Sequence, residues 1–378
     1  MPVINRRAFF ATCAAGSSAV VTPSVAGGQS PISPVAPTAS TSAPPPTPEQ
    51  RLRTVLNGAA MTQLAYVATR YGVADQLAGG PKSVDQLAAA AGVHADSLYR
   101  CLRCLAGFGI FVEEAGRRFR QNDVSALLAR DTPRSLRAQF LVRGEDFFWR
   151  SFGALRDSVK TGTTGFDLAY GQNTFEWFKS HPEAARIFDE GQAELTRALA
   201  VGISRAYPFG EARRICDIGG GNGTLLARIL DDHPGPTDTL FDLPHVVDAA
   251  GPALRRFGSR VRTHGGDFFA AVPDQHDLYL MKYILHDWED AKALAILGRT
   301  KAAMGPGATL LVLEDLVCGP NVPCNAKLGD ITMLARTGGR NLTEAEYRDL
   351  LTRGGFTVRR VIPAVGDHHV IECTPDSR

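Results

Sequence analysis

Acidic residues stand at or beside the ends of successive predicted β-strands, and a glycine-rich loop follows the first of them. Asp217 lies in a short strand that runs directly into the loop 219–223, Gly-Gly-Gly-Asn-Gly. Asp242 ends the next strand, and Asp267 belongs to the segment Gly-Asp-Phe-Phe at 266–269. A strand, a glycine loop and a helix begin a βαβ unit in which the backbone approaches a ligand closely. We therefore expect a ligand site where these strands end.

The order of these residues distinguishes between two classes of ligand. In dinucleotide sites, G-x-G-x-x-G aims a helix N-terminus at a pyrophosphate, whereas here Asp217 precedes the glycines. A ligand with an ammonium group and no phosphate suits this carboxylate better. Asp242 can accept hydrogen bonds from both hydroxyls of a ribose, Asp267 can accept from an adenine amino group, and Phe268 can lie against the base. The pattern predicts an adenosine nucleoside.

Strands and helices alternate from residue 213 onwards. We expect strands at 213–218, 238–242, 277–283 and 308–315, and helices at 224–230, 290–304 and 325–337. Thr343-x-x-Glu346 is a capping box that opens a further helix, and strands at 356–362 and 368–373 can form an antiparallel edge. This alternation predicts an α/β fold with a doubly wound, Rossmann-like sheet.

The preceding part of the chain has helical periodicity, with apolar residues at helical spacing from Glu49. Segment 83–105 predicts a helix-turn-helix, and 107–120 predicts a small β-wing. A winged helix can bind DNA, but the second helix is rich in Leu, Cys and Ala, which favours burial against another subunit. Cys101 and Cys104 lie one turn apart in it without a second pair of zinc ligands, so we interpret them as small buried side chains.

Charge and cysteine content exclude other classes of protein. The 378 residues include 41 Lys and Arg against 39 Asp and Glu, a net charge of +2. Both excess positive charges, Arg6 and Arg7, lie in the tail 1–48. The rest of the chain is formally neutral and offers no field for binding nucleic acid. The seven cysteines are too few for a disulfide scaffold, and their odd number predicts reduced thiols.

The tail 1–48 joins Arg6-Arg7 and a mildly apolar stretch to a run rich in Pro, Ser, Thr and Ala. Its front end resembles a twin-arginine export signal, and the alternative is a disordered extension. No other segment reaches the roughly 20 apolar residues that span a bilayer. We expect a cytoplasmic protein if the remainder binds a cytosolic cofactor, with export as the alternative.

Four motifs in order carry a family resemblance: DIGGGNG at 217–223, FDLPHVV at 241–247, GDFF at 266–269 and MKYILHDWED at 281–290. With them, about residues 50–375 resemble the O-methyltransferases that use S-adenosylmethionine to methylate small phenolic hydroxyls. This family includes plant caffeate-type, acetylserotonin-type and bacterial antibiotic-tailoring enzymes of secondary metabolism.

The resemblance implies a domain organisation and a set of cofactor-binding residues. A helical, winged-helix-like dimerisation domain would span 49–165 and a class I methyltransferase domain 166–378, in a homodimer. Lys282 would line the cofactor cleft, and Thr196 would lie near the methionine carboxylate. Together with Asp217, the residues that would bind S-adenosylmethionine are Gly219, Gly221, Asp242, Asp267, Phe268, Lys282 and Thr196.

Within the motif at 281–290, His286 matches the family's catalytic base. An imidazole with a pKa near 6.5 can take a proton from a phenol whose pKa is about 10. The family flanks this histidine with two glutamates. Glu314 matches the first, but Asn341 stands at the second position. An Asn can accept a hydrogen bond from the ring but brings no charge, so we expect a somewhat less basic His286.

Asn341 keeps a second interpretation open. Relatives with this fold bind the cofactor but catalyse hydroxylation, decarboxylation or pericyclic steps, and this chain could be one of them. A winged-helix regulator with a degenerate sensor domain is a third interpretation, which the neutral charge balance disfavours.

The acceptor pocket is the least defined part of the site. Phe147, Trp149, Phe175 and Met333 are candidates to line it, and Arg336 is a candidate to meet an acidic substituent, with plain packing as the alternative for each. No acidic cluster stands out beyond the nucleoside-binding acids, so we expect no metal and an activity that survives a chelator.

Overall fold

The computed structural model describes residues 45–376, so the predictions for the tail 1–48 fall almost entirely outside the described residues. The chain forms two compact units, Met1–Arg51 and Leu52–Arg378. The second unit spans most of both predicted domains. Helix α1 (Pro48–Arg70) begins just before it.

The helical part of the second unit contains the predicted helix pair and wing. α3 and α4 are separated by a turn at Gly92, whose φ of 67° is in the left-handed region. Leu87, Leu102 and Phe119 are fully buried among these elements. The elements are α2 (Val73–Leu77), α3 (Val84–Ala91), α4 (Ala95–Gly107) and a small sheet in the order β1-β3-β2, with β1 (Lys82–Ser83), β2 (Val112–Glu114) and β3 (Arg118–Arg120).

A run of helices follows the wing and surrounds a second apolar cluster. Phe147, Phe148, Phe166 and Phe178 form the centre of this aromatic cluster. The helices are α5 (Asp123–Ala126), α6 (Arg137–Gly144), α7 (Asp146–Gly153), α8 (Leu155–Thr161), α9 (Gly165–Tyr170), α10 (Thr174–Ser180) and α11 (Pro182–Ala206).

Among the described residues, the sheet has seven strands in the order β6-β5-β4-β7-β8-β10-β9. The first five in this order are parallel, and β10 is antiparallel to both β8 and β9. The predicted fold class and the antiparallel edge are confirmed, and β6 is the strand before Asp267, for which the sequence predicted an end but no bounds. The strands are β4 (Arg214–Ile218), β5 (Thr237–Asp242), β6 (Val261–Gly265), β7 (Leu278–Lys282), β8 (Thr309–Asp315), β9 (Phe356–Val365) and β10 (His368–Pro375).

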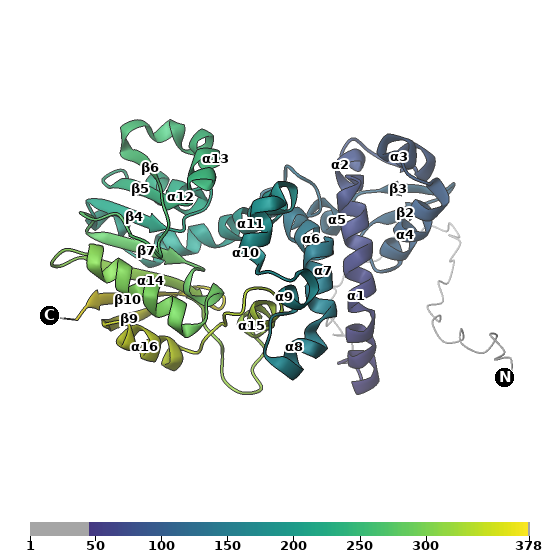
Figure 1. Ribbon diagram of the computed structural model, residues 1–378. Helices are drawn as coiled ribbons and strands as arrows, with labels where there is room; N and C mark the ends of the chain where they lie inside the picture. The colour runs from purple at the N-terminus through teal and green to yellow at the C-terminus, as the bar shows by residue number, and fades with distance from the viewer. Residues whose placement is uncertain (1–44, 377–378) are drawn as a thin grey trace, which may run out of the picture. The chain divides into compact units, whose positions relative to one another are not determined.

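Helices cover both faces of this sheet (Figure 1), because its strands alternate between two apolar faces. Leu278 and Leu280 of β7 pack with α11 and α12, whereas Tyr279 and Met281 pack with α14 and α16. A sheet buried on both faces holds the ends of its strands in fixed positions. The remaining elements are α12 (Thr224–Asp232), α13 (Pro244–Leu254), α14 (Asp290–Ala303), α15 (Asn325–Arg336), α16 (Glu344–Arg353), η1 (Phe209–Glu211), η2 (Arg255–Arg260) and η3 (Leu285–Asp287).

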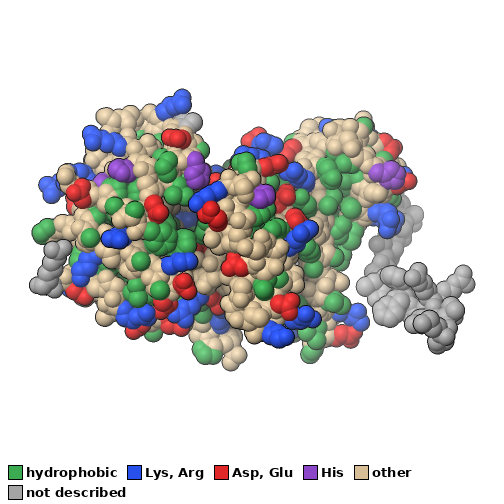
Figure 2. All heavy atoms as spheres, in the orientation of Figure 1, with side chains coloured by type: hydrophobic (Ala, Val, Ile, Leu, Met, Phe, Trp, Pro, Cys, Tyr) green, Lys and Arg blue, Asp and Glu red, His purple; other side chains and the backbone are tan. Residues whose placement is uncertain are grey.

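The face of the molecule in Figure 2 carries Lys and Arg side chains interspersed with Asp and Glu. Among the described residues, some oppositely charged side chains pair one helical turn apart, such as Arg150 with Asp146 at 3.0 Å and Arg228 with Asp232 at 2.8 Å. Exposed pairs of this kind contribute at most about 1 kcal/mol each. The mixture agrees with the small net charge of the sequence.

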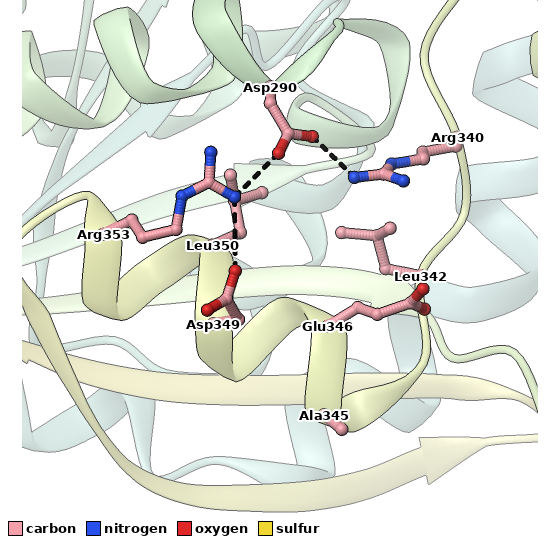
Figure 3. Close-up of a pocket in the computed structure, with 8 residues that line it drawn as sticks. All are labelled: Asp290, Arg340, Leu342, Ala345, Glu346, Asp349, Leu350 and Arg353. Carbon is pink, nitrogen blue, oxygen red and sulfur yellow. Dashed lines mark hydrogen bonds and ion pairs between the residues drawn. The ribbon is translucent and has the colours of Figure 1, made fainter.

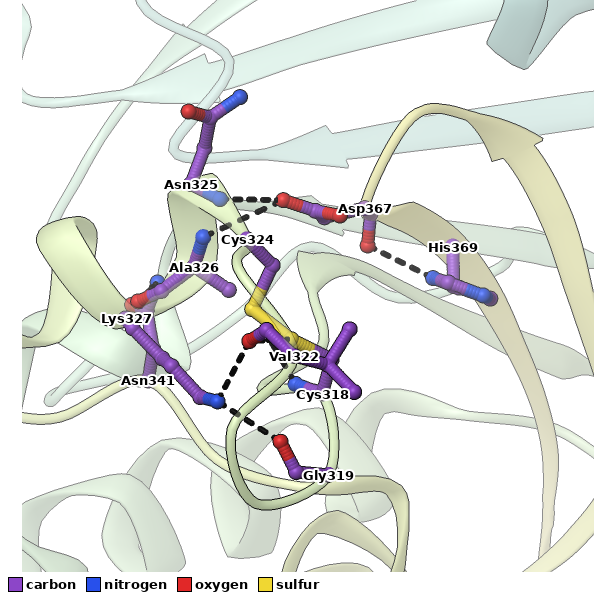
Figure 4. The surroundings of a disulfide bond; sticks show 10 residues. All are labelled: Cys318, Gly319, Val322, Cys324, Asn325, Ala326, Lys327, Asn341, Asp367 and His369. Carbon is purple, nitrogen blue, oxygen red and sulfur yellow. Dashed lines mark hydrogen bonds between the residues drawn. A yellow bond between two sulfur atoms is a disulfide. The ribbon is translucent and has the colours of Figure 1, made fainter. Parts of the chain in front are cut away.

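The expectation of reduced thiols is wrong for one pair of cysteines. Cys318 and Cys324 form a disulfide in the loop between β8 and α15 (Figure 4). The odd total misled the prediction, because it says nothing about two cysteines that a short loop brings within 6.3 Å between their Cα atoms. The other cysteines of the described residues are free: Cys101, Cys104, Cys216 and Cys373.

The same loop is also held from the turn between β9 and β10. Asp367 Oδ2 accepts a hydrogen bond from Asn325 N at 2.6 Å and lies 3.4 Å from Ala326 N. Asp367 therefore caps the N-terminus of α15, where Cys324 provides no side-chain cap. Two links thus fix the start of α15, which carries Met333 and Arg336.

Replacing Cys318 and Cys324 together by Ser should lower the free energy of unfolding by about 2 kcal/mol, because the closed loop no longer restricts the unfolded chain. Urea unfolding without a reductant measures the difference. A reductant added to the wild type should reproduce the loss. The control, Cys101→Ser with Cys104→Ser, should respond to the reductant as the wild type does, and equal urea midpoints for the wild type and the first variant would contradict the prediction.

Candidate active site

The loop between β4 and α12 requires glycine at two positions and packs on an acidic side chain. Gly219 and Gly221 have φ of 67° and 60°, in the left-handed region. A Cβ atom on Gly220 would lie 2.6 Å from Asp217 Oδ2. The backbone N–H of Gly221 donates to Asp242 Oδ2 at 2.8 Å, which ties the loop to the end of β5.

Asp217 is a buried carboxylate that lacks part of its hydrogen bonding. Its side chain is 1% exposed, and Oδ2 has no partner among the described residues. Burial raises the pKa of Asp217 to about 7, while nearby Lys282 opposes the rise and Asp242 adds to it. An ammonium group would supply both a donor and the opposite charge, so Asp217 could hold one.

Asp242 and Asp267 are oriented by backbone N–H groups at the ends of their strands. Asp242 Oδ1 accepts from Leu243 N at 2.7 Å, and Asp267 Oδ1 accepts from Phe269 N at 2.8 Å. A carboxylate has about four acceptor sites. Asp242 could therefore still accept from ribose hydroxyls, and Asp267 from an amino group.

Trp288 connects the predicted nucleoside side of the site with the predicted acceptor side. Its ring meets Phe268 edge-on, with centroids 6.2 Å apart, and stacks on Phe175 at 5.4 Å and 28°. Sequence reasoning did not single out Trp288. Its place two residues after His286, in the motif at 281–290, was the available signal.

Lys282 and Thr196 differ in how they are engaged. Burial lowers the pKa of Lys282 to about 8, although Glu314 and Asp217 act to raise it. Thr196 is 8% exposed and donates its hydroxyl proton to Gln192 O at 2.7 Å within α11. Thr196 therefore has only oxygen lone pairs left for a ligand, whereas Lys282 presents a cation between two carboxylates.

His286 and Glu314 are brought together by neighbouring strands. η3, which carries His286, follows β7, and Glu314 lies in the adjacent β8. His286 Nδ1 lies 2.8 Å from Glu314 Oε2, and both side chains are buried. The two atoms are close but not aligned as a hydrogen bond, so we describe the contact as an ion pair.

The charge of Glu314 determines the protonation of His286. Burial acts to lower the pKa of the imidazole, but attraction to Glu314 outweighs it and raises the pKa of His286 to about 9. Asp287 adds to the rise and Lys282 opposes it. At neutral pH the pair is therefore an imidazolium with a carboxylate.

Tyr283 supports one face of the imidazole. Its φ of 56° is rare for a residue with a large side chain. The ring stacks on His286, with centroids 4.9 Å apart and an angle of 28°. Its hydroxyl donates to Asp315 Oδ2 at 2.8 Å, and Asp315 in turn pairs with buried His368 at 2.9 Å. Sequence reasoning also missed Tyr283.

Asn341 does not hydrogen-bond to His286, contrary to the expectation. Its Nδ2 donates to Ala326 O at 3.1 Å, and its Oδ1 has no partner among the described residues. The backbone N–H of Asn341 donates to Asp330 Oδ1 at 3.1 Å, which turns the shorter Asn side chain toward α15. The second ring nitrogen, Nε2, instead faces Asp287 Oδ1 at 3.8 Å.

The structure brings together only some of the predicted acceptor residues. Phe147 is buried in the aromatic cluster, and the Arg336 guanidinium lies 5.8 Å from its ring centroid. Met333 Sδ accepts from Thr337 Oγ1 at 3.3 Å, one turn further along the chain. Trp149 is 40% exposed, whereas Phe147 and Phe148 of the same helix are buried. The helical repeat points Trp149 away from the cluster, so its place in the acceptor pocket stays a prediction.

Comparison with known proteins identifies the family. The model of the O-methyltransferase domain matches residues 152–357, and that of the O-methyltransferase dimerisation domain matches residues 54–131. The sequence is 36% identical over 323 residues to a phenazine O-methyltransferase of Lysobacter antibioticus, covering 85% of this chain and 94% of that protein. The chain belongs to the O-methyltransferase family.

Two further members extend this likeness. A mitomycin biosynthesis 6-O-methyltransferase of Streptomyces lavendulae is 33% identical over 86% of this chain and 94% of its own length. The crystal structure of human N-acetylserotonin methyltransferase in complex with S-adenosylmethionine matches with a TM-score of 0.81 and 25% identity, over 89% of this chain and 100% of that one. The chain is thus an O-methyltransferase of the S-adenosylmethionine-dependent class.

A pocket of about 260 Å³ in this O-methyltransferase is lined by none of the predicted site residues, although Arg340 and Leu342, on either side of Asn341, contribute to it. In Figure 3, Asp290 accepts from both Arg340 and Arg353, each at 2.8 Å. The two arginines of the pocket are thus paired with Asp290.

Across residues 45–376, no group of three or more His, Cys, Asp or Glu could hold a metal ion, and no helix there has the length and apolarity to cross a membrane.

Replacing Glu314 by Gln should lower the pKa of His286 from about 9 toward its ordinary value of about 6.5, because burial would then be opposed by Asp287 alone. NMR titration of the histidine ring protons in the cofactor-free protein measures this shift. The stability that the raised pKa provides is present below about pH 6.5 and is lost as the pH rises through about 9. The wild type should therefore lose more stability than the variant across this window.

Asp315→Asn is the matched control, because Asp315 forms its ion pair with His368 and acts on His286 only through a weaker electrostatic interaction. It should shift the titration of His286 far less than Glu314→Gln does. A His286 that titrates alike in the wild type and in Glu314→Gln would contradict the assigned cause.

Proposed function

We propose that this O-methyltransferase transfers a methyl group from S-adenosylmethionine to a phenolic or enolic hydroxyl of a small aromatic natural product, with His286 as general base. The observation that supports this is the buried pair of His286 and Glu314, with 2.8 Å between Nδ1 and Oε2, at the end of the parallel strands. Relatives named for phenazine and mitomycin chemistry support an aromatic acceptor.

The residues at the strand ends fit the cofactor group by group. Asp217 binds the ammonium, which supplies the missing partner of its Oδ2, Asp242 binds the ribose, and Asp267 and Phe268 hold the adenine. Gly219 and Gly221 let the backbone approach. The bound sulfonium supplies an electrophilic methyl group and a good leaving group, so the protein's part is to position the acceptor and to remove its proton.

The raised pKa of His286 suits a phenol. An imidazole with a pKa of about 9 lies about one unit below a free phenol, so proton transfer to it costs roughly 1.4 kcal/mol before methyl transfer consumes the phenolate. In the free protein the imidazolium predominates at neutral pH. A cationic ligand beside Lys282 and Asp217 repels a second positive charge and favours the neutral imidazole that can act as base.

Converting His286 to Ala should lower kcat by about 10²-fold or more, because the acceptor proton loses its base. Transfer to a panel of phenols is followed by mass spectrometry, and binding of S-adenosylhomocysteine by calorimetry should remain within a few-fold of the wild type. His94→Asn is the control. His94 is the exposed N-cap of α4, nearly two hundred residues before His286 in the sequence, and Asn also caps helices. Unchanged turnover in His286→Ala would refute the role of His286 as the general base.

The second candidate is a protein that binds the cofactor but catalyses a step without methyl transfer. Asn341 favours it, because it brings no charge and leaves Oδ1 unpartnered in the structure. In that case the sulfonium would act only as a fixed charge beside the acceptor.

Incubation with methyl-labelled S-adenosylmethionine should distinguish the two candidates. We expect the label in the product, together with one S-adenosylhomocysteine per product molecule, because transfer consumes the sulfonium. A product that forms without label or S-adenosylhomocysteine would overturn methyl transfer and favour the second candidate. Heat-inactivated protein is the control for non-enzymatic methylation.

We further propose a homodimer that forms through the region matched by the dimerisation domain. Leu52, Val55 and Leu56 of α1 are more than 70% exposed and repeat at helical spacing, and a second copy would cover them.

We also infer a cytoplasmic location from the cofactor. In that compartment Cys318 and Cys324 would be kept largely reduced.

A further inference from the structure

Arg336 is a buried cation at the end of α15. Its side chain is 4% exposed, and burial lowers its pKa to about 10, so the guanidinium stays charged at neutral pH. Charged side chains are almost never fully buried unless they are paired. A cation in this position therefore calls for an anionic partner.

One edge of the guanidinium lacks hydrogen-bond partners. Nε and Nη2 are both buried, and neither has a partner among the described residues. These two nitrogens form the edge that binds both oxygens of one carboxylate in parallel. Asp287 attracts Arg336 electrostatically but does not hydrogen-bond to either nitrogen.

The surroundings of this edge suit an aromatic ligand. The guanidinium lies 4.7 Å from the ring centroid of Phe188 and 5.6 Å from that of Phe148. Arg143 on α6 repels Arg336 and lies 5.8 Å from the Phe148 ring. Aromatic faces partly offset the burial of a cation, but they supply no hydrogen-bond acceptor to its edge.

Arg336 is also fixed close to the catalytic residues. Thr174 Oγ1 donates to its carbonyl oxygen at 2.7 Å. Three residues later, a Cβ atom on Gly339 would lie 2.0 Å from His286 O, so the segment after Arg336 packs against the backbone of the base. The side chains are linked through Asp287, which interacts electrostatically with both His286 and Arg336, so an acceptor whose hydroxyl faces His286 has the Arg336 guanidinium in its neighbourhood.

We propose that Arg336 binds a carboxylate of the acceptor, so that the substrate is a hydroxylated aromatic acid. This inference rests on the proposed function and names its substrate class. The carboxylate bonds to Nε and Nη2, the ring lies among the aromatic side chains, and the hydroxyl faces His286. An aromatic ester of the same shape offers a carbonyl oxygen to this edge but neither the negative charge nor the second equivalent oxygen of a carboxylate.

The test compares para-hydroxybenzoate with its methyl ester, which differ in charge at the group that meets Arg336. Calorimetry on the full chain loaded with S-adenosylhomocysteine measures the two dissociation constants. The acid should bind about 30-fold more tightly than the ester, as expected for a buried charge-assisted pair. Arg336→Met should abolish this preference and leave ester binding within about 3-fold. Arg336→Lys should keep part of it, since Lys retains the charge but not the two-pronged edge.

Arg143→Met is the matched control, because Arg143 is an exposed arginine near the same rings, and the preference for the acid should stay within about 3-fold. Thermal unfolding of each variant without ligand shows whether it is folded. If Arg336 serves only to balance Asp287, Arg336→Met will shift the pH profile of transfer equally for acid and ester and leave their ratio unchanged. That result would overturn the proposal, as would a wild type that does not bind the acid or binds the ester equally well.

Failure of this inference is distinguishable from failure of the proposed function. A protein that binds S-adenosylhomocysteine and methylates the ester as well as the acid retains the proposed function and refutes only the role of Arg336. A protein that releases no heat with S-adenosylhomocysteine refutes both.

Discussion

The buried ion pair of His286 and Glu314 is the interaction on which the rest of the site depends. Breaking such a pair leaves an uncompensated charge in an apolar interior, so β8, which carries Glu314, and β7, which leads into η3 with His286, must keep their register. β7 and β8 are adjacent and parallel, and fully buried Tyr347 lies beside Glu314. Apolar side chains on both faces of the sheet hold these backbones in place, which positions the imidazole beside Glu314.

Charges alternate along the edge where the parallel strands end. Asp217 is followed by Lys282, Lys282 by Glu314, and Glu314 by His286, each within electrostatic reach of the next. The proposed cofactor site and the proposed base are therefore coupled. A ligand that neutralises Asp217 changes the field at Lys282, and through it the balance that keeps His286 protonated.

The sequence could predict the features that local pattern determines. Strand periodicity, the glycine loop and the acids at strand ends predicted the sheet and placed Asp217 and Asp242 at one edge, whereas Glu314 was singled out by the family resemblance. It could not predict where a side chain turns once the backbone has alternatives. Asn341 turns toward α15 because Asp330 holds its backbone N–H, and the pairing of Cys318 with Cys324 depends on a loop shape that a count of cysteines does not contain.

The strand next to Glu314 has a consequence for how the protein is made. β10 lies between β8 and β9, with His369 opposite Glu314 in the ladder. During synthesis the ribosome releases β4 to β8 before β10. The edge of β8 that β10 will cover therefore stays unpaired until residue 373 has emerged. The nascent chain thus passes through a stage in which the nucleoside-binding strands exist but the strand of Glu314 is unprotected, which is the point at which pairing with another chain competes with folding.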